Sequence, residues 1–193
     1  MAIEIHPRRL VGPWDSGYAL DVHTRHSTFL GSNEAGHAQF ENDRSPIGEL
    51  LSRLKYKGEQ TALAPLVETV AMFLQTRKAR PDAIVPVPPS NVRKNQPVLS
   101  IANAVSERLK IPVCDGCLAT IKRTPQLKDI SQYHKRLEAL DGAFGVSVEQ
   151  TRSKKLLLFD DLFGSGETVG AITKVLKGPG EAEAVYLLTL TMK

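Results

Sequence analysis

The sequence has little of several things that would assign it to a specialised class. Its 193 residues include only two cysteines, Cys114 and Cys117, which excludes the disulfide framework of small secreted domains. No apolar run approaches the roughly 18 residues that a membrane-spanning helix needs. The N-terminus, MAIEIHPRRL, lacks the apolar core of a secretory signal, so we expect a cytoplasmic protein.

The remaining composition is that of an ordinary globular chain. Hydrophobic residues make up 41% and charged residues 24%, which is enough apolar material for one full core. The net charge of +4 favours a polyphosphate ligand or a nucleic acid without distinguishing between them. We see no internal repeat and no low-complexity tract.

Residues 1–43 are rich in turn residues and predict an N-terminal hairpin, which we expect to form a hood over the rest. Tyr18, Leu20 and Val22 alternate as in a strand, and residues 28–30 are its expected hairpin partner. Residues 44–193 then form the main domain.

The main domain alternates between the helical and the strand pattern. We predict helices at 45–58, 60–77, 97–109, 132–140 and 167–176, strands at 83–87, 111–113, 155–159 and 184–190, and a basic loop at 119–131. This order indicates an α/β fold with a mostly parallel central sheet flanked by helices. Ligands bind such sheets outside the carboxyl ends of the strands.

The strongest motif is LLLFDDLFGSGET, residues 156–168, at such a strand end. Glycines let the backbone approach an anion, and backbone amides at a helix N-terminus bind phosphate. The candidate phosphate ligands are Gly164, Ser165, Gly166, Glu167 and Thr168. The carboxylates of Asp160 and Asp161 would repel a phosphate, so ribose hydroxyls, or hydroxyls shared with Mg²⁺, are their natural partners.

Three other interpretations of this motif are weaker. A dinucleotide fingerprint at Gly164, Gly166 and Gly170 would need a nucleotide-binding fold after it, but only 23 residues follow Gly170. A Walker A loop needs a Gly-Lys-Ser/Thr that is absent. An ordinary strand-turn-helix does not explain two adjacent acids at the end of a buried strand.

A second loop follows the strand at 83–87. Its sequence, VPVPPSNVRK, could bind a diphosphate, and by itself it is equally a proline-rich surface turn. The candidate residues are Pro89, Ser90, Asn91 and Arg93.

Residues 156–168 resemble the motif that binds 5-phosphoribosyl pyrophosphate (PRPP) in type I phosphoribosyltransferases. RSPIGELLSRLKYKGE, PVPPSNVRKNQPVLSIANAVSERL and KRTPQLKDISQYHKRLEALDGAF resemble, in the same order, segments of the ComF family of these enzymes. The resemblance covers residues 44–193. The chain departs from it in lacking a cysteine-rich zinc ribbon in residues 1–43, in the residues before Gly142, and at Gly164, where Thr or Ser is common.

The resemblance implies a type I phosphoribosyltransferase fold and a PRPP-dependent transferase. Asp160 and Asp161 would hold the ribose hydroxyls, with the cofactor Mg²⁺ held indirectly, and residues 164–168 the 5-phosphate. Pro89, Ser90, Asn91 and Arg93 would form the pyrophosphate loop, and Lys122, Arg123, Gln126 and Lys128 a flexible loop that closes over the site. A nitrogen nucleophile, not identified by the sequence, would displace pyrophosphate. Lys55 and Lys57 are weaker candidates, because LKYKG is also a normal basic helix end.

Other functions stay open. The same fold could serve a non-catalytic sensor or a competence protein for DNA uptake, and nucleic acid could bind the basic clusters at Arg77, Lys122 and Lys135. A homodimer is also open. Cys114 and Cys117 form a CxxC without a second pair, so we expect free thiols rather than a metal site.

Overall fold

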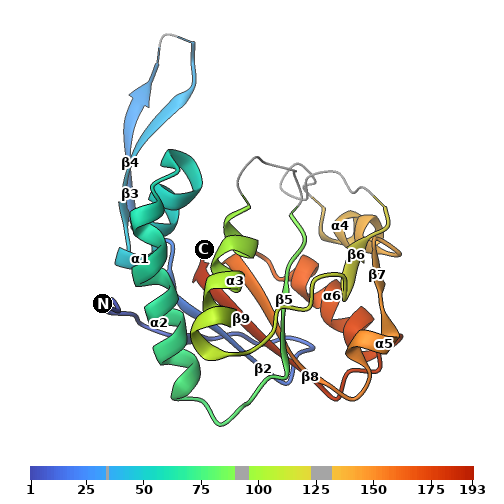
Figure 1. The fold of residues 1–193 in the computed structure, drawn as a ribbon. Coiled ribbons are helices and arrows are strands. Elements are labelled where there is room, and N and C mark those ends of the chain that lie inside the picture. The colour runs from blue at the N-terminus through green and yellow to red at the C-terminus, as the bar shows by residue number, and fades with distance from the viewer. Residues whose placement is uncertain (34, 90–95, 123–131) are drawn as a thin grey trace.

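A computed structural model of the chain describes residues 1–33, 35–89, 96–122 and 132–193. Its centre is a five-stranded sheet in the order β1-β2-β9-β8-β5 (Figure 1). The strands are β1 (Arg8–Arg9), β2 (Ser16–Val22), β9 (Ala184–Met192), β8 (Lys155–Phe163) and β5 (Ala83–Pro86). All neighbours are parallel except β1 and β2, which pair antiparallel. The predicted α/β class with a mostly parallel sheet is therefore confirmed.

Helices cover both faces of this sheet (Figure 1). On one face lie α1 (Pro46–Ser52), α2 (Leu63–Gln75) and α3 (Pro97–Leu109), and on the other lies α6 (Glu167–Lys177). Beside α6 are the short helices α4 (Tyr133–Leu140) and α5 (Val148–Thr151), with the two-stranded sheet of β6 (Leu118–Thr120) and β7 (Phe144–Val146). A sheet covered on both faces needs strands that are apolar throughout.

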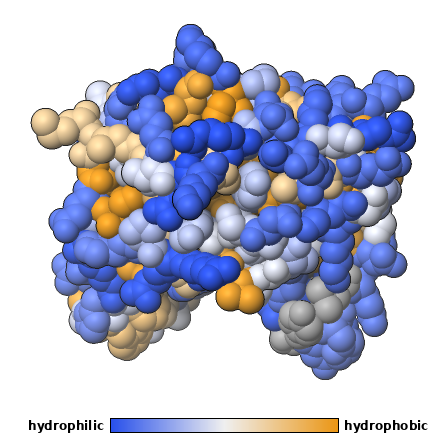
Figure 2. Space-filling view, turned by 90° about the horizontal axis from the view of Figure 1, so that it is seen from below, coloured by the Kyte–Doolittle hydropathy of each residue, from blue (hydrophilic) through white to orange (hydrophobic). Residues whose placement is uncertain are grey.

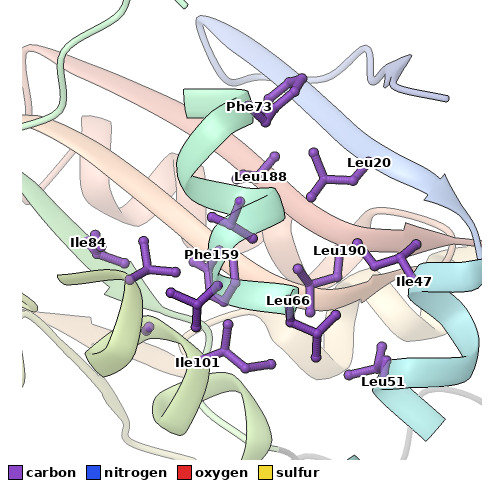
Figure 3. Packing of buried hydrophobic residues seen from close by; sticks show 14 of the residues in the cluster. Leu20, Ile47, Leu51, Leu66, Phe73, Ile84, Ile101, Phe159, Leu188 and Leu190 are labelled. Atoms are coloured by element: carbon purple, nitrogen blue, oxygen red, sulfur yellow. The ribbon is translucent and has the colours of Figure 1, made fainter. Parts of the chain in front are cut away.

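Strand β8 shows this requirement most clearly. Side chains alternate between the two faces of a strand. Leu157 and Phe159 pack into the core beneath α1, α2 and α3, whereas Leu156 and Leu158 pack into the core beneath α6. In the first core Phe159 lies among Leu66, Ile101 and Leu190 (Figure 3).

The predicted start and end of the first helical stretch are confirmed. Ser45 caps α1 by accepting a hydrogen bond from the Gly48 N–H at 3.1 Å, with Pro46 at the first helical position. Gly58 ends the stretch with φ of 69°, a conformation that favours glycine. Between them the chain changes to a π-helix, Arg53–Lys57, which the sequence did not indicate. A 3₁₀ turn, Gln60–Ala62, then leads into α2.

The predicted N-terminal hairpin is wrong in its pairing. Residues 18–22 do form a strand, but β2 pairs in parallel with β9 in the central sheet. The physical reason is burial: Ala19 and Leu20, on opposite faces of β2, are both fully buried, which a half-exposed hairpin cannot achieve. The hairpin is instead β3 (Thr24–Ser32) with β4 (Ala38–Arg44), outside the central sheet. The boundary at residue 43 stays a prediction.

Three smaller expectations are corrected. Residues 111–113 contribute only an isolated bridge between Ile84 and Val113, because the segment is too short for a ladder. Strand β8 continues four residues beyond the predicted end at Phe159, because β9 stays paired with it as far as Met192. Cys114 and Cys117 form a disulfide rather than free thiols; the turn at Gly116, with φ of 97°, brings their Cα atoms to 5.5 Å.

One face of the molecule shows how polar and apolar side chains are distributed on it. Seen from the side where β5 and β8 begin, it is mostly hydrophilic with separate apolar patches (Figure 2). Among the described helices, none is long and apolar enough to cross a membrane.

Candidate functional site

A pocket of about 760 Å³ lies at the carboxyl ends of β5, β8 and β9. Its position follows the rule for open parallel sheets. Segments far apart in the sequence line it, among them Lys55, residues 85–89, 96–99 and 114–116, Arg136, residues 160–169 and Lys193. The acidic pair and the glycine loop of the LLLFDDLFGSGET motif thus line the same pocket.

The two acids project to opposite sides of β8. Asp160 pairs with Thr189 of β9, and the ladder continues beyond Asp161, so both acids lie within the strand. Strand alternation places Asp161 on the side of Phe159, facing α1 to α3, and Asp160 on the side of α6. Two neighbouring carboxylates therefore meet different surroundings.

The carboxylate of Asp161 is held by Lys55. Nζ of Lys55 lies 2.7 Å from Oδ2 of Asp161, and the two side chains are only 20% and 12% exposed. Lys55 comes from the π-helix, a feature often found at functional sites. The sequence indicated Lys55 only as a weak candidate, because 106 positions separate it from Asp161 and no local pattern reveals the helix register.

The carboxyl group of Asp160 is poorly disposed to ionise. Burial, and then the negative charge of Asp161, raise its pKa from 3.8 to about 7. The backbone N–H of Asp161, at 2.8 Å, and the charge of Lys55 act in the opposite direction. Its neutral form is therefore favoured more than that of an ordinary carboxyl group, and a ligand that interacts with the anion would promote ionisation.

Behind the acids, His23 joins a chain of hydrogen bonds. The hydroxyl of Thr191 donates to the carbonyl oxygen of Asp161 at 3.0 Å, and Nδ1 of His23 lies 3.2 Å from that hydroxyl. Since the hydroxyl proton is used, Nδ1 must be the protonated nitrogen. Burial, and then the charges of Arg44 and Lys55, lower the pKa of His23, which keeps the imidazole neutral. Sequence reasoning gave His23 no role.

The glycine loop leads into α6 at Gly166. This glycine has φ of 86°, and a Cβ there would come within 2.9 Å of the Phe163 ring. No side chain caps the helix, and its first backbone bond runs from the Gly170 N–H to the Gly166 carbonyl. The N–H groups at the start of α6 are therefore available to an anion. Gly164 is different, since a Cβ there would meet nothing within 4 Å.

Glu167 interacts with Arg136 instead of extending into the pocket. Nε of Arg136 lies 3.2 Å from Oε1 of Glu167, whose side chain is only 2% exposed. This pair ties α4 to the start of α6. Glu167 can thus offer a phosphate its backbone N–H, whereas its side chain is engaged elsewhere.

The structure describes only part of the two predicted loops. Pro89 lines the pocket. Lys122 follows β6 on the exposed surface and is not among the described lining residues. Ser90, Asn91, Arg93, Arg123, Gln126 and Lys128 lie outside the described residues. Within the described ranges, no three His, Cys, Asp or Glu side chains form a group that could hold a metal by themselves.

Comparison with known proteins finds a curated protein and several solved structures that are similar to this chain. No family model matches the chain. It is 26% identical over 154 residues to "Competence protein F" of Haemophilus influenzae. The aligned region covers 72% of this chain and 65% of that protein. Among solved structures, a glutamine PRPP amidotransferase from B. subtilis matches 82% of this chain and 34% of its own, with a TM-score of 0.50 at 16% identity. An adenine phosphoribosyltransferase from Saccharomyces cerevisiae matches 86% of this chain and 83% of its own at 12% identity, but its TM-score of 0.46 is too low to support a conclusion.

The fold is that of the type I phosphoribosyltransferases, as predicted. The resemblance to the ComF family is likewise confirmed by the similarity to competence protein F. The chain spans about 65% of that relative and about a third of the amidotransferase, so their complete activities do not transfer with the fold.

Proposed function

We propose that the protein is a PRPP-dependent phosphoribosyltransferase. The observation that supports this most is the pocket that the acidic pair and the glycine loop both line, at the carboxyl ends of the parallel strands. A phosphate-binding helix terminus beside carboxylates fits a sugar that carries both a 5-phosphate and free hydroxyls.

The 5-phosphate would lie at the start of α6. Backbone N–H groups of Glu167 and Thr168, with the hydroxyls of Ser165 and Thr168, would donate to its oxygens. The positive end of the helix dipole adds favourable electrostatics. Gly166, with φ of 86°, sets the turn that leads into the first N–H groups of α6.

The ribose hydroxyls would donate to Asp160 and Asp161. These carboxylates also fit a role near Mg²⁺, because this ion binds one or two protein carboxylates and takes its other oxygens from substrate phosphates and water. When bound, Mg²⁺ would supply charge neutralisation for the pyrophosphate leaving group.

In the proposed reaction the bond from C1 to the pyrophosphate oxygen breaks and a bond from C1 to a nitrogen forms. The nitrogen then loses a proton, and pyrophosphate departs with the electrons of the broken bond. The protein contributes position and charge. Lys55 holds Asp161 in place, and Arg136 fixes the first turn of α6 through Glu167. The residues predicted to close over the site would exclude water.

A second candidate function is a binding protein without turnover, which the likeness to a protein named for competence favours. DNA binding would need free basic side chains. In two of the predicted basic clusters, those at Arg77 and Lys135, an arginine already interacts with another side chain of the same chain. Arg136 pairs with Glu167, and Arg77 lies 4.8 Å from the ring centroid of Tyr18. We therefore favour the enzyme.

Isothermal titration with Mg·PRPP tests the proposal. The wild type should bind saturably, and the double variant Asp160→Asn/Asp161→Asn should bind at least about tenfold more weakly. A matched double variant at exposed acids, Asp43→Asn/Asp141→Asn, should bind as the wild type does. Absence of saturable binding, or equal binding by all three proteins, would contradict it.

Turnover needs its own measurement. Pyrophosphate release is followed with a panel of nucleobases and amines at saturating Mg·PRPP. Release that depends on one acceptor establishes the enzyme. If PRPP binds but no acceptor supports release, while salt-sensitive DNA binding appears, the second candidate is preferred.

A further inference from the structure

The β3–β4 hairpin has no counterpart in the proposed chemistry. It extends away from the central sheet beside α1 (Figure 1). Arg44 ties its base to Glu49 of α1 at 3.3 Å, and every described residue beyond this base between 27 and 43 is at least partly exposed. Two-stranded hairpins are marginally stable in water unless something packs on them.

Large apolar side chains are concentrated on this hairpin. Phe29, Leu30 and Phe40 are 58%, 63% and 53% exposed. Phe29 and Phe40 are cross-strand partners with ring centroids 5.5 Å apart, so they form one aromatic pair on one face. A clustered, exposed aromatic pair marks an interaction surface.

The residues next to this pair on its face are uncharged, and Arg44, further along β4 on the same face, is paired with Glu49 of α1. Ser27 and Asn42 form the cross-strand pair two positions along the ladder, so strand alternation places them on the same face as the aromatic pair. The Ser27 hydroxyl donates a hydrogen bond of 2.8 Å to the side-chain oxygen of Asn42. The intervening Thr28–Glu41 pair lies on the opposite face, so the acidic side chain of Glu41 points away from the rings. We call the four residues Ser27, Phe29, Phe40 and Asn42 the aromatic face.

The charges of the hairpin decide which partner fits. Residues 24–44 contain two basic and three acidic residues, a net charge of −1 in a chain of +4. A nucleic acid or an anionic membrane would need the opposite sign. A second copy of the same hairpin would present the same four uncharged residues, and such a face is complementary to itself about a two-fold axis.

The edges of the hairpin are less suited to pairing than its face. Register shifts interrupt the ladder between Thr24 and His26 and between Phe29 and Gly31. Bulges and charged side chains are the usual devices that prevent strands from adding to an edge. Face-to-face packing does not depend on a regular edge.

We propose that the aromatic face is a self-association surface, on which two copies of the chain pack their Phe29–Phe40 pairs against each other. Phe29 and Phe40, 58% and 53% exposed, offer roughly 200 Å² of side chain together. A stable interface needs about 800 Å² per partner, so the surrounding strands must supply the rest. The geometry therefore predicts a weak, micromolar dimer.

Sedimentation equilibrium tests the proposal with the intact chain, between about 1 and 200 μM. The wild type should approach twice the 21.2 kDa of one chain as its concentration rises. Phe29→Ser/Phe40→Ser should dimerise with at least a tenfold larger dissociation constant, so that its average mass stays below that of the wild type across this range. Val11→Ser/Met72→Ser removes exposed apolar side chains, 90% and 56% exposed, outside the hairpin and should dimerise as the wild type does.

Hydrogen exchange on the wild type gives a second readout that needs no variant. Amides of β3 and β4 should exchange more slowly at high than at low concentration. A wild type that is monomeric throughout, or a dimer unaffected by the Phe29/Phe40 change, would overturn the proposal. The proposal would also be overturned if hydrogen exchange in the hairpin did not depend on protein concentration. That result is the one expected if a different protein, rather than a second copy, binds this face.

Discussion

The carboxyl group of Asp160, which we propose binds the ligand, should lower the free energy of unfolding of the free protein at neutral and higher pH. Its pKa is about 7 in the folded protein against an ordinary value of 3.8, because burial and the charge of Asp161 disfavour the anion. Between these two values the folded state binds more protons than the unfolded state. The free energy of unfolding therefore falls as the pH rises through this window, and the loss is complete above about pH 7. Asp160→Asn cannot ionise, so it should be more stable than the wild type at pH 8.

The size of the effect follows from the shift. Three pKa units correspond to about 4 kcal/mol, which is an upper limit. Asp160 borders the pocket, and water there screens its charge, so we expect about 1–2 kcal/mol. For a chain of this size that is a rise of about 2–8 °C in Tm. Thermal unfolding by circular dichroism, with a chelator and without PRPP, should show this rise at pH 8 and a much smaller one at pH 5.

The neighbouring acid supplies the control. Asp161→Asn removes a carboxylate that pairs with Lys55 at 2.7 Å, and it leaves a largely buried ammonium group without its partner. It should lower the free energy of unfolding by about 1–3 kcal/mol at pH 8. At pH 8 we therefore expect Asp160→Asn to raise the free energy of unfolding and Asp161→Asn to lower it. If Asp160→Asn is less stable than the wild type at pH 8, or changes Tm equally at both pH values, the account of Asp160 is wrong.

Three further changes probe the pocket. Lys55→Met removes a positive charge that lowers the pKa of Asp160, so the pKa of Asp160 should rise in this variant. Titration calorimetry should then show half-maximal Mg·PRPP binding at a higher pH than in the wild type. Gly164→Ser fills open space beside the loop and should tighten Mg·PRPP binding about 3- to 10-fold through one added hydroxyl, whereas equal or weaker binding would contradict this. Gly166→Ala places a Cβ at φ of 86° within 2.9 Å of Phe163, so chemical denaturation should show a loss of about 1–2 kcal/mol, with Gly164→Ala near neutral as its matched control.

Local signals made much of the fold predictable. Ser45-Pro46 and Gly58 mark the start and end of a helical stretch, and Pro97 to Leu109 is a helix with the predicted bounds. The strand from Lys155 was recognised from its continuous apolar run. Each of these depends on neighbours in sequence, which is where capping and periodicity act.

Long-range pairing was not predictable in the same way. The alternation of Tyr18, Leu20 and Val22 is compatible with either a hairpin or an inner strand, and only its pairing with β9, at the far end of the chain, decides between them. The Lys55–Asp161 pair has the same origin, because the π-helix sets the register of Lys55. The sequence therefore predicts which residues belong to the site, but it does not predict which of them are in contact.

The two acids of the motif illustrate why this matters for chemistry. A strand that ended at Phe159 would leave Asp160 and Asp161 on a loop, free to face one ligand together. Because β8 continues, alternation gives Asp161 a lysine partner and leaves Asp160 half-buried beside the pocket, with the N–H of Asp161 as its hydrogen-bond donor. Pairs of carboxyl groups whose surroundings differ in this way can divide their tasks. We therefore expect Asp161 to act as a fixed anion that orders the site, and Asp160 to ionise as the ligand binds, so that substitutions at the two positions are not equivalent.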